Sequence, residues 1–227
     1  MPRERKGISK RKSKIKDTRR YFVIASEGAD TERIYFEGLA KLIIKNGLDR
    51  LIKIEFLVRS GESERAKSAH KDIIKQLDTY KKKYRLDEKD ELWLVIDRDK
   101  QTNKINTFAD TAQKCIQKNY FLALSNPNFE LWLLLHLKDL NDYSEEKINT
   151  LLENKKVENS HRNALEKELF DLLNEYNKSH YKFEKFESCI PDAIQRAKDL
   201  DKNPNERWVE NSLGSRVYLL VEKIITP

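Results

Sequence analysis

The stretch ELWLVIDRDK, residues 91–100, decides how the rest of this sequence is interpreted. Its first part is an apolar run, which is typical of a strand buried within a parallel sheet. Asp97 and Asp99 follow two residues apart, so an extended backbone points both side chains to the same side. Two adjacent carboxylates repel each other unless a cation lies between them, and Mg²⁺ prefers such oxygen ligands. The stretch therefore predicts a divalent metal site at a strand end, with capping of the next helix as the alternative role for Asp99.

Three further apolar runs precede or follow this strand, and each is succeeded by a helical pattern. This order, strand then helix four times over, predicts a parallel sheet of about four strands flanked by helices. The additional strands are expected at YFVIAS (21–26), IKIEFLVR (52–59) and YFLALS (120–125).

Apolar stripes at helical spacing continue through the last third of the chain, so a helical C-terminal portion is expected to pack on the sheet. The predicted organisation is a basic flexible tail (1–20), an α/β domain (21–137) and a helical extension (138–227).

Acidic residues follow two other predicted strands. Glu27 comes directly after the first strand, and Glu130 lies near the start of the helix that Pro127 is expected to open after the fourth. Because functional sites of parallel sheets lie at the carboxyl ends of the strands, these acids should gather near Asp97. Glu27 is expected to bind metal or act as general base on an attacking water, and Glu130 to be a further metal ligand.

Polar residues around these acids are candidates for binding substrate. Glycine permits a sharp turn beside Glu27, and small hydrogen-bonding side chains join the fourth strand to its helix. Each of three candidates also has a structural alternative. Glu32 could favour its helix N-terminus through the helix dipole, and His136 could be a buried core histidine. The segment of Arg216 could be a helix cap. The candidates are Gly28, Glu32, Arg98, Ser125, Asn126, Asn128, His136 and Arg216.

Two other local expectations follow from the sequence context of the residues concerned. Asp30 or Thr31 can cap the first helix. The remaining histidines, which stand among charged residues, are expected at the surface: His70, His161 and His180.

The net charge of +7 is concentrated at the N-terminus. Residues 1–20 carry +8, whereas the rest of the chain carries −1. Such a tail suits contact with nucleic-acid phosphates, because each neutralised phosphate releases counterions. The alternative is a solvated extension that aids solubility.

Several classes of protein are excluded by what the sequence lacks. Its apolar runs are too short to cross a bilayer, so no membrane role is expected. Cys115 and Cys189 follow no metal spacing and are expected to be reduced thiols on apolar helix faces, which favours a cytoplasmic location. No P-loop, G-x-S-x-G or H-E-x-x-H pattern is present.

The acid–glycine turn after the first strand and the D-x-D after a later strand resemble the Toprim pattern. More closely, EGADTERIYFEGL (27–39), LVIDRDK (94–100) and SNPNFELWLLLH (125–136) resemble the RloB family of bacterial restriction-locus and abortive-infection proteins. The likeness spans roughly residues 20–137 and, more loosely, NSLGSRVYLLVEKI (211–224).

This resemblance implies a Toprim-like fold, with Glu27 as the Toprim glutamate and Asp97 and Asp99 as the D-x-D pair. It implies that Glu130 serves a second metal. The lysine of nuclease-type members has no clear counterpart in this sequence, and Arg98 and Lys100 are the candidates for its place. The chain has no room for the strand-passage domain of a topoisomerase and lacks the zinc module of a primase.

The resemblance therefore implies a Mg²⁺- or Mn²⁺-dependent nuclease that cuts RNA, including tRNA, or DNA. Its implied setting is an anti-phage defence system, with a separate ATPase sensor subunit as partner.

Two other functions remain open. A phosphatase of the haloacid-dehalogenase kind also uses D-x-D after a strand, with the first aspartate as nucleophile. That pattern normally sits on the first strand and has Thr or Val where Gln101 stands here. The other alternative is a non-catalytic, nucleic-acid-binding or regulatory subunit of a defence complex.

Overall fold

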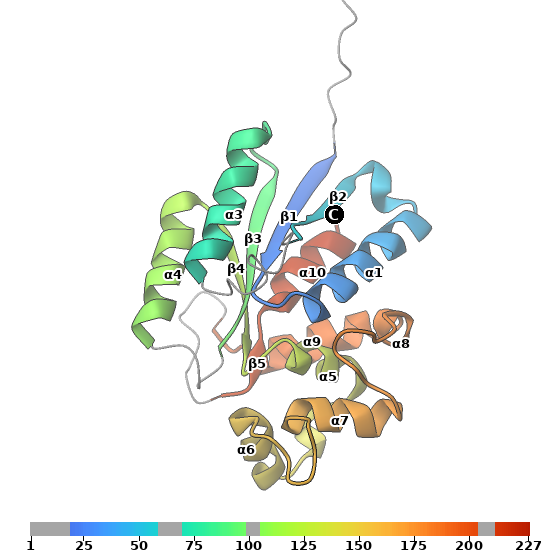
Figure 1. The fold of residues 1–227 in the computed structure, drawn as a ribbon. Helices are drawn as coiled ribbons and strands as arrows, with labels where there is room; N and C mark the ends of the chain where they lie inside the picture. Colours follow the sequence, from blue (N-terminus) through green and yellow to red (C-terminus); the bar gives the residue numbers. More distant parts are fainter. Residues whose placement is uncertain (1–18, 59–69, 99–104, 204–211) are drawn as a thin grey trace, which may run out of the picture.

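The computed structural model describes residues 19–58, 70–98, 105–203 and 212–227. Its centre is a five-stranded sheet in the order β2-β1-β3-β4-β5 (Figure 1). The first four strands are parallel, as predicted, and β5 pairs antiparallel to β4. The strands are β1 (Arg20–Ser26), β2 (Ile52–Phe56), β3 (Glu91–Asp97), β4 (Phe121–Asn126) and β5 (Gly214–Ser215).

Helices follow each parallel strand and then fill the C-terminal portion. Those of the first part are α1 (Thr31–Lys45), α3 (His70–Lys83), α4 (Ile105–Lys118) and α5 (Glu130–Leu137). The C-terminal helices are α6 (Glu145–Glu153), α7 (Ala164–Leu173), α8 (Glu184–Glu187), α9 (Ile190–Leu200) and α10 (Val217–Ile225). Two short 3₁₀ helices are η1 (Leu48–Arg50) and η2 (Leu140–Asp142). The predicted mixed α/β fold with a helical C-terminal portion is confirmed.

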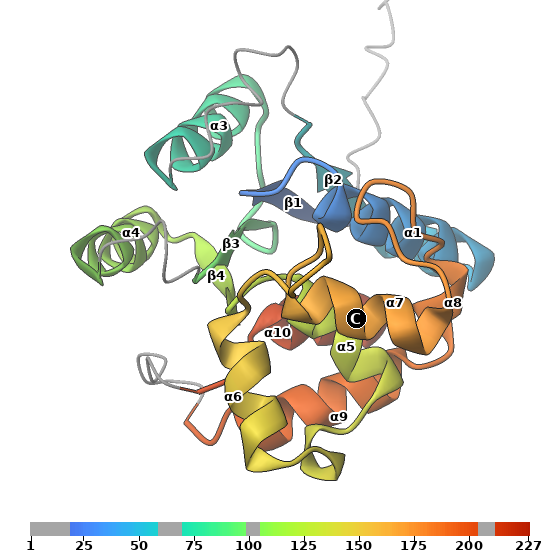
Figure 2. The same ribbon diagram turned by 60° about the horizontal axis from the view of Figure 1, so that its bottom comes forward.

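The sheet separates two hydrophobic cores. Figures 1 and 2 show, from two directions, the helices that lie on its two faces. Successive side chains of a strand point to opposite faces, so Phe22 and Ile24 enter one core while Val23 and Ala25 enter the other. Helices α3 and α4 cover the smaller core. Helices α1, α5, α9 and α10 build the larger one.

The boundaries differ from prediction where the sequence carries little periodic signal. Strand β2 ends at Phe56 rather than near residue 59, and α5 begins at Glu130 rather than directly after Pro127. Strand β5 was not predicted, because two residues leave no alternation to detect.

The thiols of both cysteines are free. The predicted burial of Cys115 in a helix face is confirmed, whereas Cys189 precedes α9 and is only half-buried. No helix within the described ranges combines the length and the apolar character needed to cross a bilayer.

Gly38 lies where α1 meets the segment before α8. A Cβ atom at this position would lie 2.2 Å from Cγ of Phe183, whose ring is buried and contacts Tyr35 edge-on at 5.3 Å. Alanine normally stabilises a helix relative to glycine. Here we expect Gly38→Ala to lower the free energy of unfolding by about 1–3 kcal/mol, because the core is overpacked.

Urea denaturation measures this effect directly. Glu37→Ala, on the exposed side of the same helix, is the matched control and should change stability by about 0.5 kcal/mol or less. A Gly38→Ala protein more stable than the wild type would show that Phe183 moves aside freely.

Candidate active site

The register of β1 against β3 brings Glu27 and Asp97 together. Ser26 pairs with Val95, and the N–H of Glu27 donates to the carbonyl oxygen of Val95 at 3.0 Å. The N–H of Asp97 in turn donates to Oε2 of Glu27 at 3.3 Å. The backbone of the sheet therefore places these two predicted site residues in contact.

The turn between β1 and α1 holds a second carboxylate, that of Glu32. The N–H of Gly28 donates to Oε1 of Glu32 at 3.0 Å, and the hydroxyl of Ser26 donates to the carbonyl of Gly28 at 2.7 Å. Glu32 is buried although it stands in the first turn of α1. Asp30 occupies the predicted N-cap position of α1, although its side chain makes no cap hydrogen bond. The carboxylate of Asp30 instead accepts from Arg33.

Gly28 is required for this arrangement. A Cβ atom there would lie 2.0 Å from Oε2 of Glu32, so an alanine must displace the carboxylate and break its bond to the Gly28 N–H. We expect Gly28→Ala to cost about 1–2 kcal/mol of stability.

A double-mutant cycle with Glu32→Ala tests this cause. Once the carboxylate is gone, adding the methyl group at Gly28 should cost much less. If Gly28→Ala costs as much stability in Glu32→Ala as in the wild type, the strain arises elsewhere in the turn.

Asp97 is a carboxylate in an environment that opposes its charge. Its Oδ1 is buried and has no hydrogen-bond partner among the described residues. Burial raises the pKa of Asp97 well above its ordinary value, and the negative charges of Glu32, Glu130 and Glu27 raise it further. A backbone hydrogen bond from Phe129 opposes that rise. The arrangement favours either a proton or a metal cation at Asp97.

Glu130 lies at the start of α5 and is also buried. Burial raises its pKa to about 7, repulsion from Glu32 adds to the effect, and Lys178 opposes it. This carboxyl group therefore changes protonation state close to neutral pH.

A pocket of about 330 Å³ opens beside these acids. Its walls come from the β1–α1 turn, the end of β3, the β4–α5 junction and two segments of the C-terminal portion. The lining residues are Gly28, Ala29, Asp30, Thr31, Glu32, Asp97, Asn128, Phe129, Glu130, Asn163, Glu166, Lys178 and Ser179. The structure thus brings together five predicted site residues: Gly28, Glu32, Asp97, Asn128 and Glu130.

The C-terminal wall of this pocket was not predicted. Asn163 caps α7 through its bond with the N–H of Glu166, and Lys178 lies 3.4 Å from Glu166. The carbonyl oxygen of Lys178 accepts from the hydroxyl of Thr31, and Ser179 donates to Asp30. These contacts join residues about 150 positions apart, for which the local sequence gives no signal.

His70 is a further residue that sequence reasoning missed. It was expected at the surface, but only 3% of it is exposed. Its Nδ1 lies 2.9 Å from the hydroxyl oxygen of Thr111, and its Nε2 lies 3.6 Å from Oε2 of Glu27. The signal was present, because His70 shares one helix face with the buried Ile73, Ile74 and Leu77. His161 and His180 are exposed, as expected.

Other predicted site residues have different neighbours. The hydroxyls of Ser125 and Ser215 lie 2.8 Å apart, and the amide of Asn126 donates to the carbonyl of Ser212. These bonds attach β5 to β4. Arg216 makes a two-pronged ion pair with Asp201, at 2.8 and 3.0 Å, and does not line the pocket.

His136 is a buried member of the larger core. Its Nδ1 donates to the carbonyl of Trp132, and its Nε2 accepts from the hydroxyl of Tyr35. Burial lowers the pKa of His136 to about 3, so the ring is neutral. The structure therefore supports the core-histidine alternative at this position.

Some predicted features lie outside the described residues, namely Asp99, Lys100 and the basic tail up to residue 18. Arg98 is described, and its N–H donates to the carbonyl of Ser125.

Within the described part of the chain, these residues have the chemistry that a divalent metal requires. The carboxylates of Asp97, Glu27, Glu32 and Glu130 are the oxygen donors that Mg²⁺ prefers, and Oδ1 of Asp97 makes no hydrogen bond there. In their present positions, however, no three or more His, Cys, Asp or Glu side chains of the described ranges form a group that could hold the ion.

Comparison with known proteins gives one result that bears on this site. A family model described as RloB-like protein matches residues 22–224, which includes every wall of the pocket. No curated protein and no solved structure matched the chain.

Proposed function

Because the chain belongs to the RloB-like protein family, we propose that it is a metal-dependent nuclease with a Toprim-like active site, acting as the effector of a bacterial anti-phage defence system. A separate ATPase sensor is the proposed partner. RNA, including tRNA, and DNA are the proposed classes of substrate.

The buried carboxylate of Asp97 carries this proposal. Burying a charge is costly unless it is paired, yet the charged groups that act most strongly on Asp97 are three other carboxylates. Its Oδ1 makes no hydrogen bond within the described part of the chain. A divalent cation would compensate both deficiencies at once, and these acids line or adjoin a pocket at the carboxyl ends of the strands.

The residues proposed to hold the cation are Asp97, Glu27 and Asp99, with Glu130 serving a second ion. When bound, Mg²⁺ or Mn²⁺ supplies charge that neutralises a scissile phosphate and lowers the pKa of a coordinated water.

The remaining groups of the pocket have roles that follow from their chemistry. Glu130, with a pKa of about 7, is suited to accept or donate a proton near neutral pH. Lys178 puts a cation beside the same acids and is suited to hold a phosphate oxygen. It is a candidate for the lysine that the sequence did not reveal. Gly28 and Glu32 shape the turn that carries Glu27.

A gel assay tests the proposal. Purified protein is incubated with tRNA, single-stranded DNA or duplex DNA in Mg²⁺, Mn²⁺ or EDTA, beside an Asp97→Asn variant. Metal-dependent cutting that the variant lacks would support the proposal and identify the substrate.

A second candidate is a non-catalytic, nucleic-acid-binding subunit of a defence complex. The positive charge concentrated in residues 1–20 favours it, because such a segment suits contact with nucleic-acid phosphates. Calorimetry discriminates the two, because a nuclease site should take up Mg²⁺ or Mn²⁺ in the wild type and less in Asp97→Asn. No cutting together with no metal uptake would favour the binding subunit.

A further inference from the structure

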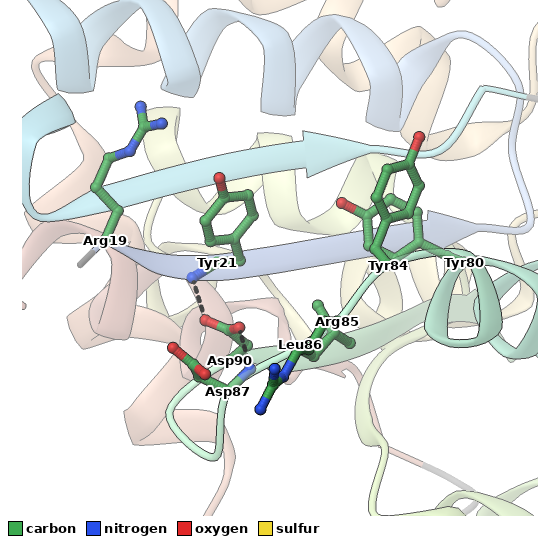
Figure 3. A pocket seen from close by; sticks show the side chains of 8 residues that line it. All are labelled: Arg19, Tyr21, Tyr80, Tyr84, Arg85, Leu86, Asp87 and Asp90. Atoms are coloured by element: carbon green, nitrogen blue, oxygen red, sulfur yellow. Dashed lines mark hydrogen bonds between the residues drawn. The ribbon is translucent and has the colours of Figure 1, made fainter. Parts of the chain in front are cut away.

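A second pocket lies at the opposite end of the sheet from the acids. It has a volume of about 410 Å³, within the range typical of ligand-binding pockets. Figure 3 shows it between the start of β1, the end of α3 and the loop that leads into β3. A strand of seven residues such as β1 extends about 20 Å, so this pocket is remote from Asp97.

Aromatic rings form one side of this pocket. Tyr21 extends from β1, and Tyr80 and Tyr84 come from the end of α3 (Figure 3). The rings of Tyr80 and Tyr84 have centroids 4.5 Å apart at an angle of 35°. Tyr84 is 46% exposed, so part of its side chain is accessible from solvent.

Cations surround these rings. The guanidinium of Arg19 lies 6.0 Å from the centre of the Tyr21 ring, and Nζ of Lys83 lies 5.3 Å from that of Tyr84. Nζ of Lys53 lies 5.1 Å from the Tyr21 ring, and the exposed Arg85 completes the lining on the side of the loop. Aromatic rings interleaved with lysine and arginine are typical of surfaces that bind single-stranded nucleic acid.

One acid of this pocket serves to build it. Oδ1 of Asp90 accepts from the N–H of Tyr21 at 2.9 Å, and Oδ2 accepts from the N–H of Asp87 at 2.7 Å (Figure 3). Asp90 thereby anchors the loop to the backbone of β1 at Tyr21. Burial raises the pKa of Tyr80 to about 12, so its hydroxyl stays protonated and can donate a hydrogen bond.

We propose that this pocket binds a base of single-stranded nucleic acid by stacking on Tyr84, with the surrounding lysines and arginines holding the adjacent phosphates. This proposal rests on the proposed function in one respect only, namely that the polymer bound is a nucleic acid. It would hold a strand about 20 Å from the acids, so that recognition and cutting occur at different ends of the sheet.

The test is binding, measured without cleavage. Fluorescence anisotropy of labelled ten-nucleotide single strands, one RNA and one DNA of mixed sequence, is recorded in EDTA with the full chain. Tyr84→Ala removes the ring, Tyr84→Phe keeps it, and Tyr143→Ala is the matched control. Tyr143 also lies between two lysines, each 5.8 Å from its ring, but belongs to the C-terminal portion. Thermal unfolding checks that each variant is folded.

We expect Tyr84→Ala to weaken binding of at least one strand about tenfold, and Tyr84→Phe and Tyr143→Ala to bind within about twofold of the wild type. Raising the salt concentration should weaken strand binding by all the proteins. The ratio of wild-type to Tyr84→Ala affinity should stay the same, because stacking is less sensitive to salt than phosphate contact.

Equal affinities of wild type and a folded Tyr84→Ala would overturn the proposal, as would a wild type that binds neither strand. Displacement of the strand by an equal concentration of free AMP would also overturn it, because a mononucleotide site would then be present. The gel assay with Asp97→Asn is independent, so binding at Tyr84 can be supported even if no cutting is found.

Discussion

Asp97→Asn should abolish metal-dependent cutting of nucleic acid, by about a thousandfold or more. The substitution keeps the size of the side chain and removes its charge. The asparagine cannot pair with a cation as the carboxylate would, and the neighbouring acids cannot replace it from their present positions. Initial rates on the substrate found in the gel assay, at saturating Mg²⁺, measure the effect.

Stability separates this effect from simple unfolding. Since the charge of Asp97 is opposed by burial and by Glu32, Glu130 and Glu27, its removal should leave the metal-free protein at least as stable as the wild type. Asp110→Asn, at an exposed position of α4, is the matched control and should retain full activity. An active Asp97→Asn protein would contradict the proposed role, whatever its stability.

Glu130→Gln should stabilise the metal-free protein at pH 8 by about 3 kcal/mol while changing little near pH 4. Folding raises the pKa of Glu130 from 4.5 to about 7, because it buries the carboxyl group next to Glu32. Below pH 4.5 the group is protonated in both states and contributes no penalty. Between pH 4.5 and about 7 the unfolded chain ionises this group while the folded protein keeps it protonated, so wild-type stability falls across that range and then levels off, whereas glutamine does not titrate.

Urea denaturation in EDTA at several pH values measures this difference. The exposed Glu88→Gln is the matched control, and its difference from the wild type should not grow with pH. Added Mg²⁺ should stabilise the wild type at pH 8 more than it stabilises Glu130→Gln, because a bound cation relieves the same repulsion. A constant difference between pH 4 and pH 8 would contradict the assigned cause.

The parallel strands and the acids at their ends were predictable for a simple physical reason. Strands buried on both faces must be continuously apolar, so β1, β3 and β4 stand out in the sequence. Because these strands are parallel, the residues that follow them all lie at the same edge of the sheet, where the carboxyl ends of the strands meet. For Glu27 and Asp97 this argument is confirmed as far as their proximity is concerned.

The parts that were missed depend on contacts between distant segments. Lys178 reaches the pocket because its loop bonds to Thr31, and nothing around residue 178 indicates this. Strand β5 is too short to have a pattern, although the hydroxyl of its Ser215 bonds with that of Ser125, a side chain that was predicted to bind substrate. His70 was misjudged because charged neighbours obscured its apolar helix face.

The joining of the β1–α1 turn to the loop of Lys178 also determines when, during synthesis, the pocket becomes complete. During synthesis the acids emerge first, but the wall formed by Asn163, Glu166 and Lys178 does not exist until most of the chain has been made. A product truncated before that point would also expose the core faces of α1 that Phe183 covers. Incomplete copies would therefore carry the acids without a finished pocket, and their apolar surface would mark them for degradation.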